Sequence, residues 1–127
     1  MFKIMMSATV LAAAATGALA DQQGALVQTA KLGDALYLVD VAKMTLYTFD
    51  KDADGQSNCY DMCAKNWPPL IAAEGVSLPA GYATTTRKDG AMQVTYKDQP
   101  LYLWVKDMKP GQQTGEGVNG VWHIARP

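Results

Sequence analysis

Residues 34–52 read DALYLVDVAKMTLYTFDKD, and residues 89–107, 55 positions further on, read DGAMQVTYKDQPLYLWVKD. Six of the 19 aligned positions are identical, and each segment ends in Leu-Tyr-x-aromatic-x-Lys-Asp. The aromatic residue is Phe49 in the first segment and Trp104 in the second. Repeated units bury a shared core that neither makes alone, so the duplication predicts two similar halves with pseudo-twofold symmetry.

Short runs rich in β-forming residues, separated by turns that contain Asp, Asn or Gly, make up most of the chain. The runs are Ala35–Val39, Thr45–Phe49, Ala91–Tyr96, Pro100–Val105 and Val121–Ile124, with weaker candidates at Ala25–Lys31 and Tyr82–Arg87. Strands so close in sequence pair antiparallel, because parallel pairing needs a long crossover. Asn119-Gly120 predicts a hairpin with a type I′ turn, since both residues accept a positive φ.

One short helix is predicted from about Asn58 to Asn66, with Ser57 or Asn58 as its cap and Pro68-Pro69 as its stop. The sequence therefore predicts a mainly β domain with a small antiparallel sheet, barrel- or sandwich-like in form. The helix lies between two similar hairpin repeats at about 34–52 and 89–107.

The N-terminus has the order of a secretory signal peptide: Met1-Phe2-Lys3, an apolar stretch over 4–15, and small residues up to Ala20. The stretch is shorter than the roughly 20 apolar residues of a membrane span. We expect cleavage after Ala20, a single domain over 21–127, and a periplasmic or secreted protein. Asp21 follows the cleavage site, so no lipid anchor is expected.

Charge and composition exclude some classes of partner. Without Lys3 the chain has 10 basic and 12 acidic residues, a net charge of −2. A nucleic-acid binder needs a basic stripe to neutralise phosphates, and none is present in the sequence. The same balance argues against an electrostatic membrane binder, and no second long apolar run follows the signal.

Two segments fit the pattern Y-x-(F/W/Y)-x-x-D. They are Tyr47–Asp52, with Phe49 at the aromatic position, and Tyr102–Asp107, with Trp104 there. Further matching motifs are Cys59-x-x-x-Cys63-Ala64, Trp67-Pro68-Pro69-Leu70, Arg87-x-Asp89-Gly90, Gln93-Val94-Thr95-Tyr96, Pro100-Leu101-Tyr102 and Gly120-Val121-Trp122. Through these residues, which span almost all of 32–127, the chain resembles the bacterial predicted-lipoprotein family named for the pattern, also called the secreted repeat of unknown function.

The resemblance implies an envelope or secreted protein, and it implies no reaction, cofactor or ligand. Many members of this family are lipid-anchored through a cysteine after the signal, and this chain departs from them at Asp21.

The aromatic residues of the pattern share one face of a strand, because residues i and i+2 point the same way. Tyr47 and Phe49 therefore share one face of their strand, and Tyr102 and Trp104 share one face of theirs. Core packing is the simpler interpretation, since each ring buries about 150–250 Å². A stacking platform for a sugar, a peptide or a planar cofactor is the alternative. Asp52 and Asp107 are expected to accept backbone hydrogen bonds in the following turns.

Asp50-x-Asp52-x-Asp54-Gly55 is close to the start of the calcium loop D-x-D-x-D-G-x5-E, with Asp61 at its twelfth place. Asp61 stands where that loop has a bidentate Glu, and a strand leads in where the loop has a helix. Ordinary turns also contain such Asp-Gly stretches, so a turn is the favoured interpretation and calcium the alternative.

The cysteines Cys59 and Cys63 are close in sequence, and in an oxidising compartment they are expected to form a disulfide. The spacing is not C-x-x-C, the spacing of thioredoxin-like motifs. Thiol or copper chemistry is the alternative, and the residues that would join it are Met44, Met62, Met108 and His123.

The sequence has one histidine and none of the common hydrolase, metalloprotease or phosphate-loop motifs. We therefore expect a non-enzymatic envelope module that binds an envelope protein or a small ligand, or has a structural role. The alternative is a metal-handling protein that uses calcium at the Asp50–Asp61 loop or copper at the cysteines.

Overall fold

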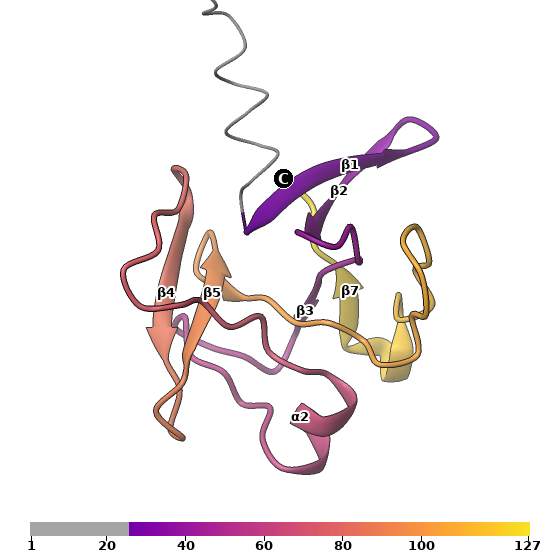
Figure 1. The fold of residues 1–127 in the computed structure, drawn as a ribbon. Helices are drawn as coiled ribbons and strands as arrows, with labels where there is room; N and C mark the ends of the chain where they lie inside the picture. Colours follow the sequence, from indigo (N-terminus) through magenta and orange to yellow (C-terminus); the bar gives the residue numbers. More distant parts are fainter. Residues whose placement is uncertain (1–25) are drawn as a thin grey trace, which may run out of the picture.

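A computed structural model describes residues 26–127 of the chain (Figure 1). The predicted export signal over 1–20 and its cleavage site lie outside the described residues. The elements are β1 (Val27–Leu32), β2 (Ala35–Asp40), β3 (Tyr47–Phe49), α2 (Met62–Asn66), β4 (Tyr82–Thr86), β5 (Met92–Tyr96), β6 (Gln99–Pro100), the 3-10 turn η2 (Val118–Gly120) and β7 (Trp122–Ile124). We call residues 26–81 the first half and residues 82–127 the second half.

The strands form three small sheets with the orders β1-β2, β3-β7 and β4-β5-β6, and all their pairings are antiparallel. In Figure 1 the hairpin β4-β5 lies at the left and the hairpin β1-β2 at the upper right, with β3 near the centre and β7 beside it, below β1-β2. The mainly β, antiparallel prediction is confirmed, and so are the two repeats and the short helix with its disulfide.

The helix is shorter than predicted, because the residues proposed as its cap have other partners. Ser57 is buried and its Oγ lies 2.7 Å from Tyr102 Oη, and Asn58 N donates to Asp52 Oδ1 at 2.7 Å. Asp61 then has a φ of 58°, which no right-handed helix continues through, so α2 begins only at Met62. The prediction of a helix from Asn58 was wrong.

The Asn119-Gly120 turn has the predicted backbone, but the predicted hairpin is wrong. Asn119 and Gly120 have φ values of 54° and 73°, and Val121 N donates to Val118 O at 3.1 Å. The turn leads into β7, and β7 pairs with β3 from the other half instead of a strand just before the turn. Long-range pairing has replaced the local pairing that the turn residues favour.

The run predicted as one strand over Pro100–Val105 changes partner along its length. Pro100 pairs with β5, Tyr102 forms a bridge with Tyr47, and Leu103 N donates to Pro68 O at 2.7 Å. Because three different partners share the six residues of the run, only Pro100 belongs to a regular strand, β6, together with Gln99 before it.

Tyr47 and Tyr102, which occupy equivalent places in the two repeats, lie side by side at the centre. Tyr47 N donates to Tyr102 O at 2.8 Å, and Tyr102 N donates to Tyr47 O at 3.0 Å. This reciprocal pair marks the pseudo-twofold axis. Around it the halves exchange partners: Ala125 N donates to Leu46 O at 2.8 Å, and Leu70 N donates to Leu101 O at 2.9 Å.

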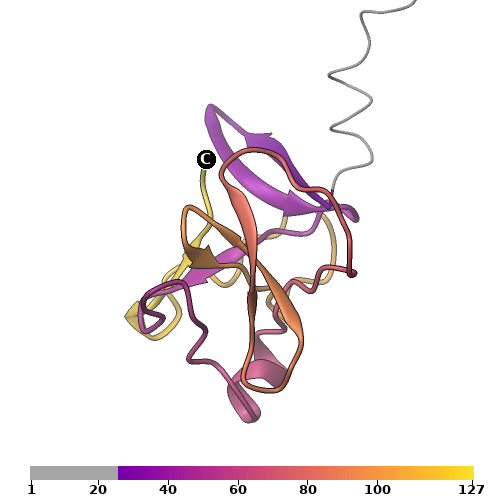
Figure 2. The ribbon, with the colours of Figure 1, turned by 90° about the vertical axis from the view of Figure 1, so that its left-hand side faces the viewer.

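Two apolar clusters flank this axis. One is mainly aliphatic and centres on Leu38, Leu46, Val94 and Leu101, and the other is mainly aromatic and contains both repeat tyrosines. The C-terminal segment returns to the β1-β2 hairpin, where Leu38 N donates to Ala125 O at 2.9 Å (Figure 2). No helix among residues 26–127 has the length and apolarity needed to cross a membrane.

Candidate functional site

The tyrosine of each motif is hydrogen-bonded to the aspartate of the other motif, not to the aspartate of its own motif. Tyr47 Oη donates to Asp107 Oδ2 at 2.6 Å, and Tyr102 Oη donates to Asp52 Oδ2 at 2.6 Å. Each motif therefore supplies the phenol for one pair and the carboxylate for the other. The two short hydrogen bonds join the halves on either side of the Tyr47–Tyr102 backbone bridge.

The second oxygen of each aspartate binds the loop that follows it, as predicted. Asp52 Oδ1 accepts from Asn58 N at 2.7 Å. Asp107 Oδ1 accepts from Thr114 N at 2.9 Å and from Thr114 Oγ1 at 2.6 Å. Each carboxylate thus holds its own loop with one oxygen and the opposite half with the other.

Burial at this centre favours the uncharged forms of Tyr47, Tyr102 and Asp52. Burial, followed by the hydrogen bond to an aspartate, raises the pKa of Tyr47 and of Tyr102 well above the ordinary tyrosine range. Burial also raises the pKa of Asp52, although the hydrogen bonds from Tyr102 and Asn58 act in the opposite direction. The tyrosines therefore remain protonated donors over the whole physiological pH range.

Four aromatic rings form a continuous stack across the axis. In order they are Phe49, Trp122, Trp67 and Trp104, with ring centroids separated by 4.1, 3.8 and 3.9 Å. Both faces of Trp67 and both faces of Trp122 are covered by neighbouring rings. Tyr47 packs edge-on against Trp67, and Tyr102 packs edge-on against Trp122. The rings of Trp67 and Trp122 are therefore packed inside the stack, whereas Phe49 and Trp104 at its two ends are half-buried.

The stacking of Trp67 on Trp122 was not predicted from the sequence. These residues are 55 positions apart, the same offset as the two motifs, and this offset was the signal that could have identified them. The packing beside them is tight: a Cβ added at Gly115 would lie 2.8 Å from the Tyr47 ring and 2.9 Å from the Trp67 ring. Gly115 is therefore required for close approach.

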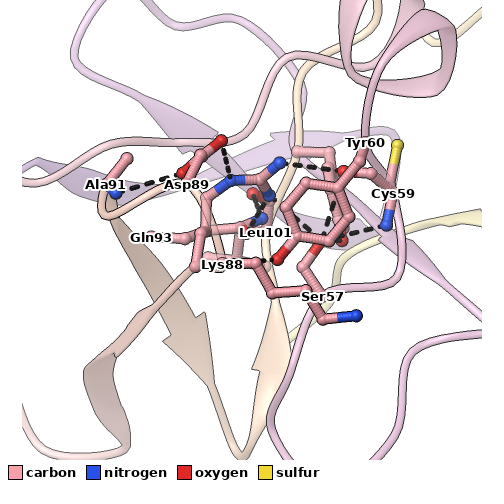
Figure 3. A network of polar contacts seen from close by, with 10 residues as sticks. Ser57, Cys59, Tyr60, Lys88, Asp89, Ala91, Gln93 and Leu101 are labelled. Atoms are coloured by element: carbon pink, nitrogen blue, oxygen red, sulfur yellow. Dashed lines mark hydrogen bonds and ion pairs between the residues drawn. The ribbon is translucent and has the colours of Figure 1, made fainter.

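Buried Arg87 is the centre of a second polar network, which the sequence did not reveal. Figure 3 shows residues of this network, among them Ser57, Cys59 and Gln93. Arg87 Nη1 donates to Gln93 Oε1 at 2.7 Å and to Ser57 Oγ at 3.0 Å, and its Nη2 donates to Cys59 O at 2.8 Å. The guanidinium also lies 4.4 Å from the centroid of the Tyr60 ring. Arg87 thereby attaches the β4-β5 hairpin to the first-half loop that carries the disulfide.

Asp89 neutralises Arg87 from the surface, at 3.3 Å from Nε. The backbone N–H of Ala91, and then Arg87, hold the pKa of Asp89 below its usual range. Arg87 is therefore fully engaged in structural contacts.

The model of the family described as secreted repeat of unknown function matches the chain twice, over residues 27–71 and 83–126. The chain belongs to this family. Each secreted repeat contains one hairpin, one Tyr–Asp motif and one of the two equivalent tryptophans, Trp67 or Trp122. Searches of curated proteins and of solved structures found no match.

The acidic residues proposed for calcium in the first secreted repeat do not converge. Asp52 binds Tyr102 and Asn58, and Asp50 Oδ2 lies 2.9 Å from Nε2 of His123. A shallow cavity of about 290 Å³ is lined by Asp50, Asp52 and Asp54, but not by Asp61. Within residues 26–127, no group of three or more His, Cys, Asp or Glu side chains is placed to hold a metal ion.

The cysteines of the first secreted repeat form the expected disulfide, Cys59–Cys63, and the described residues contain no free cysteine. The other residues considered for copper are separate: Met62 and Met108 are exposed, and His123 binds two carboxylates. These carboxylates belong to Asp50 and Glu116, and they raise the pKa of His123, with the Asp50 hydrogen bond as the larger cause.

An open groove of about 400 Å³ lies over the rims of the stacked rings. Its lining comes from both secreted repeats and consists of Phe49, Lys51, Cys63, Asn66, Trp67, Asn119, Val121 and Trp122. Lys51, Asn66 and Asn119 are exposed, and their side chains make no hydrogen bond or ion pair within residues 26–127. This groove exposes part of the aromatic centre to a ligand.

Proposed function

We propose that this chain is a non-enzymatic binding module of the bacterial envelope, in which two secreted repeats form one rigid core. The observation that carries the proposal is the crossed pairing of Tyr47 with Asp107 and of Tyr102 with Asp52. An acid or base in catalysis needs a titratable group directed at a substrate. Here the phenols and carboxylates of the motif are directed at one another and at backbone N–H groups.

The family description supports an exported location, because it describes a secreted repeat. We propose that the processed chain, from Asp21, works in the periplasm or outside the cell without a lipid anchor. The disulfide agrees with this, because disulfides persist in oxidising compartments. The exposed residues around the aromatic core, not the motif itself, would then contact the envelope partner or ligand.

Native mass spectrometry of the protein purified from the envelope of its own host tests this proposal. We expect the mass of a chain that begins at Asp21, with the disulfide formed and no metal ion, alone or with a companion that denaturation removes. Incubation of the purified protein with EDTA should leave its melting temperature unchanged. A metal ion retained at a fixed stoichiometry, whose removal lowers the melting temperature, would favour the metal-handling alternative instead.

A further inference from the structure

We infer that the groove over the stacked rings binds a carboxylated saccharide, that is, a sugar unit bearing an acid group. This inference rests on the proposed binding function and names the ligand class for it. The groove crosses the pseudo-twofold axis, because Trp67 and Trp122 line it together and are repeat equivalents. Both secreted repeats therefore contribute equivalent residues to this one surface.

The internal repeat supplies a comparison for the polar residues of the groove. Asn66 has Val121 as its equivalent 55 positions on, and Asn119 corresponds to Ala64. Both asparagines line the groove, at the end of α2 and in the turn before β7. Two carboxamides thus face a surface where the related positions are apolar, and neither amide has a partner within residues 26–127. The positive φ of its turn accounts for Asn119, whereas Asn66 has no positive φ and is exposed, so neither a turn nor core packing accounts for it.

The tryptophans present their rims to this groove, because stacking covers their faces. Trp104 Nε1 is the only side-chain nitrogen or oxygen of residues 26–127 that is buried without a partner. The indole N–H groups of Trp67 and Trp122 also have no partner there, so they reach solvent. Ring rims carry the positive part of the aromatic quadrupole and favour an electron-rich ligand.

The positive charge of Lys51 indicates that the ligand carries a negative charge. Lys51 lines the groove and forms no ion pair within residues 26–127, and no carboxylate of these residues lines the groove. A carboxylate on the ligand would complete a charge-assisted hydrogen bond with Lys51. The ligand is therefore expected to be acidic.

The distribution of polar groups distinguishes a saccharide from a simple anion. A phosphate or acetate ion requires donors at one point, whereas these donors are distributed over a groove of about 400 Å³. Each carboxamide offers both a donor and an acceptor, which matches a hydroxyl group, itself a donor and an acceptor. A ligand that matches these residues carries several hydroxyl groups and one carboxylate on a scaffold of a few ångströms. An acidic sugar has this composition.

The test is a titration of the processed protein with trigalacturonate, followed by the three indole N–H signals in ¹H–¹⁵N NMR spectra. Maltotriose serves as the neutral trisaccharide, monomeric galacturonate as the free acid sugar, and phosphate as the simple anion. The matched variants are Lys51→Ala and Lys106→Ala, because Lys106 is the repeat equivalent of Lys51 and does not line the groove. Melting temperatures establish that both variants are folded.

We expect saturable shifts with trigalacturonate that are largest for the indole signals of Trp67 and Trp122. Lys51→Ala should weaken this binding about tenfold, as for loss of a hydrogen bond to a charged group, and Lys106→Ala should not. Equal binding of maltotriose or phosphate, equal losses in the two variants, or no saturable shift would each overturn the inference. None of these outcomes affects the metal-free, non-enzymatic core, which the native mass spectrum tests separately.

Discussion

The hydroxyl group of Tyr47 has two partners, and both belong to the second half: it donates to Asp107 and accepts from Gly115 N at 3.1 Å. The hydroxyl group of Tyr102 is placed in the same way, between Asp52 and Ser57 of the first half. A buried phenol that lost its proton would place a second negative charge beside a carboxylate. The neutral phenol is thus part of the native structure.

Stability should therefore fall at alkaline pH. The folded-state pKa values of Tyr47 and Tyr102 are raised by burial, whereas in the unfolded chain tyrosine loses its proton at about pH 10. The stabilisation is complete below that pH and is lost as pH rises toward the folded-state pKa. At pH 11 the loss is about 1.4 kcal/mol for each such tyrosine.

Urea unfolding at pH 8 and at pH 11 measures this effect. Tyr82, whose pKa burial raises to about 12, adds to the loss in all variants. Tyr47→Phe should be less stable than the wild-type chain at pH 8 and should lose less between the two pH values. An identical loss in both proteins would show that Tyr47 ionises as readily in the folded state as in the unfolded chain.

The loops after the two motifs differ between the halves, because only the first contains an α-helix and a disulfide. Cys59 and Cys63 in the first loop have Thr114 and Val118 as their equivalents in the second. The second loop is held by Thr114, which donates two hydrogen bonds to Asp107. The same arrangement of loop and aspartate therefore forms without a disulfide, so the disulfide adds stability to a loop that Asp52 already orders.

Replacing both cysteines, by Cys59→Ala with Cys63→Ala, should weaken the fold without changing it. The closed loop is very short, so we expect a loss of about 1–3 kcal/mol. For a domain of this size that corresponds to a fall in melting temperature of roughly 5–20 °C. Thermal unfolding followed by circular dichroism measures it, with the β signature retained at low temperature. An unchanged melting temperature would instead favour a redox or metal role for the pair.

Local sequence patterns predicted the bounds of the strands more accurately than the bounds of the helix between them. β2 and β5 follow from short β-forming runs bounded by turns, and their predicted bounds differ by one residue from those observed. The start of α2 was predicted four residues too early, because Ser57 and Asn58 bind distant side chains instead of capping the helix. Such long-range partners are not visible in local sequence patterns.

At the scale of the molecule, the repeat was evident from the sequence, but its connections were not. An offset of 55 shows that Tyr47 and Tyr102 are equivalent, and it does not show which aspartate each one binds. Which aspartate each tyrosine binds depends on the pairing of segments from different halves around the axis. There β3 pairs with β7, and Tyr102 forms a bridge with Pro69. The candidate groove was hidden for the same reason, since its two tryptophans come from different repeats.

The crossed pairing holds the two halves of the fold together, because each Tyr–Asp pair takes its tyrosine from one secreted repeat and its aspartate from the other. Double-mutant cycles on the free energy of unfolding test it most directly. One cycle combines Tyr47→Phe with Asp107→Ala, the pair from opposite halves, and the matched cycle combines Tyr47→Phe with Asp52→Ala, the pair within one motif. We predict a coupling energy of about 1–2 kcal/mol in the first cycle and additivity within about 0.5 kcal/mol in the second. Coupling in the second cycle and additivity in the first would contradict the crossed arrangement.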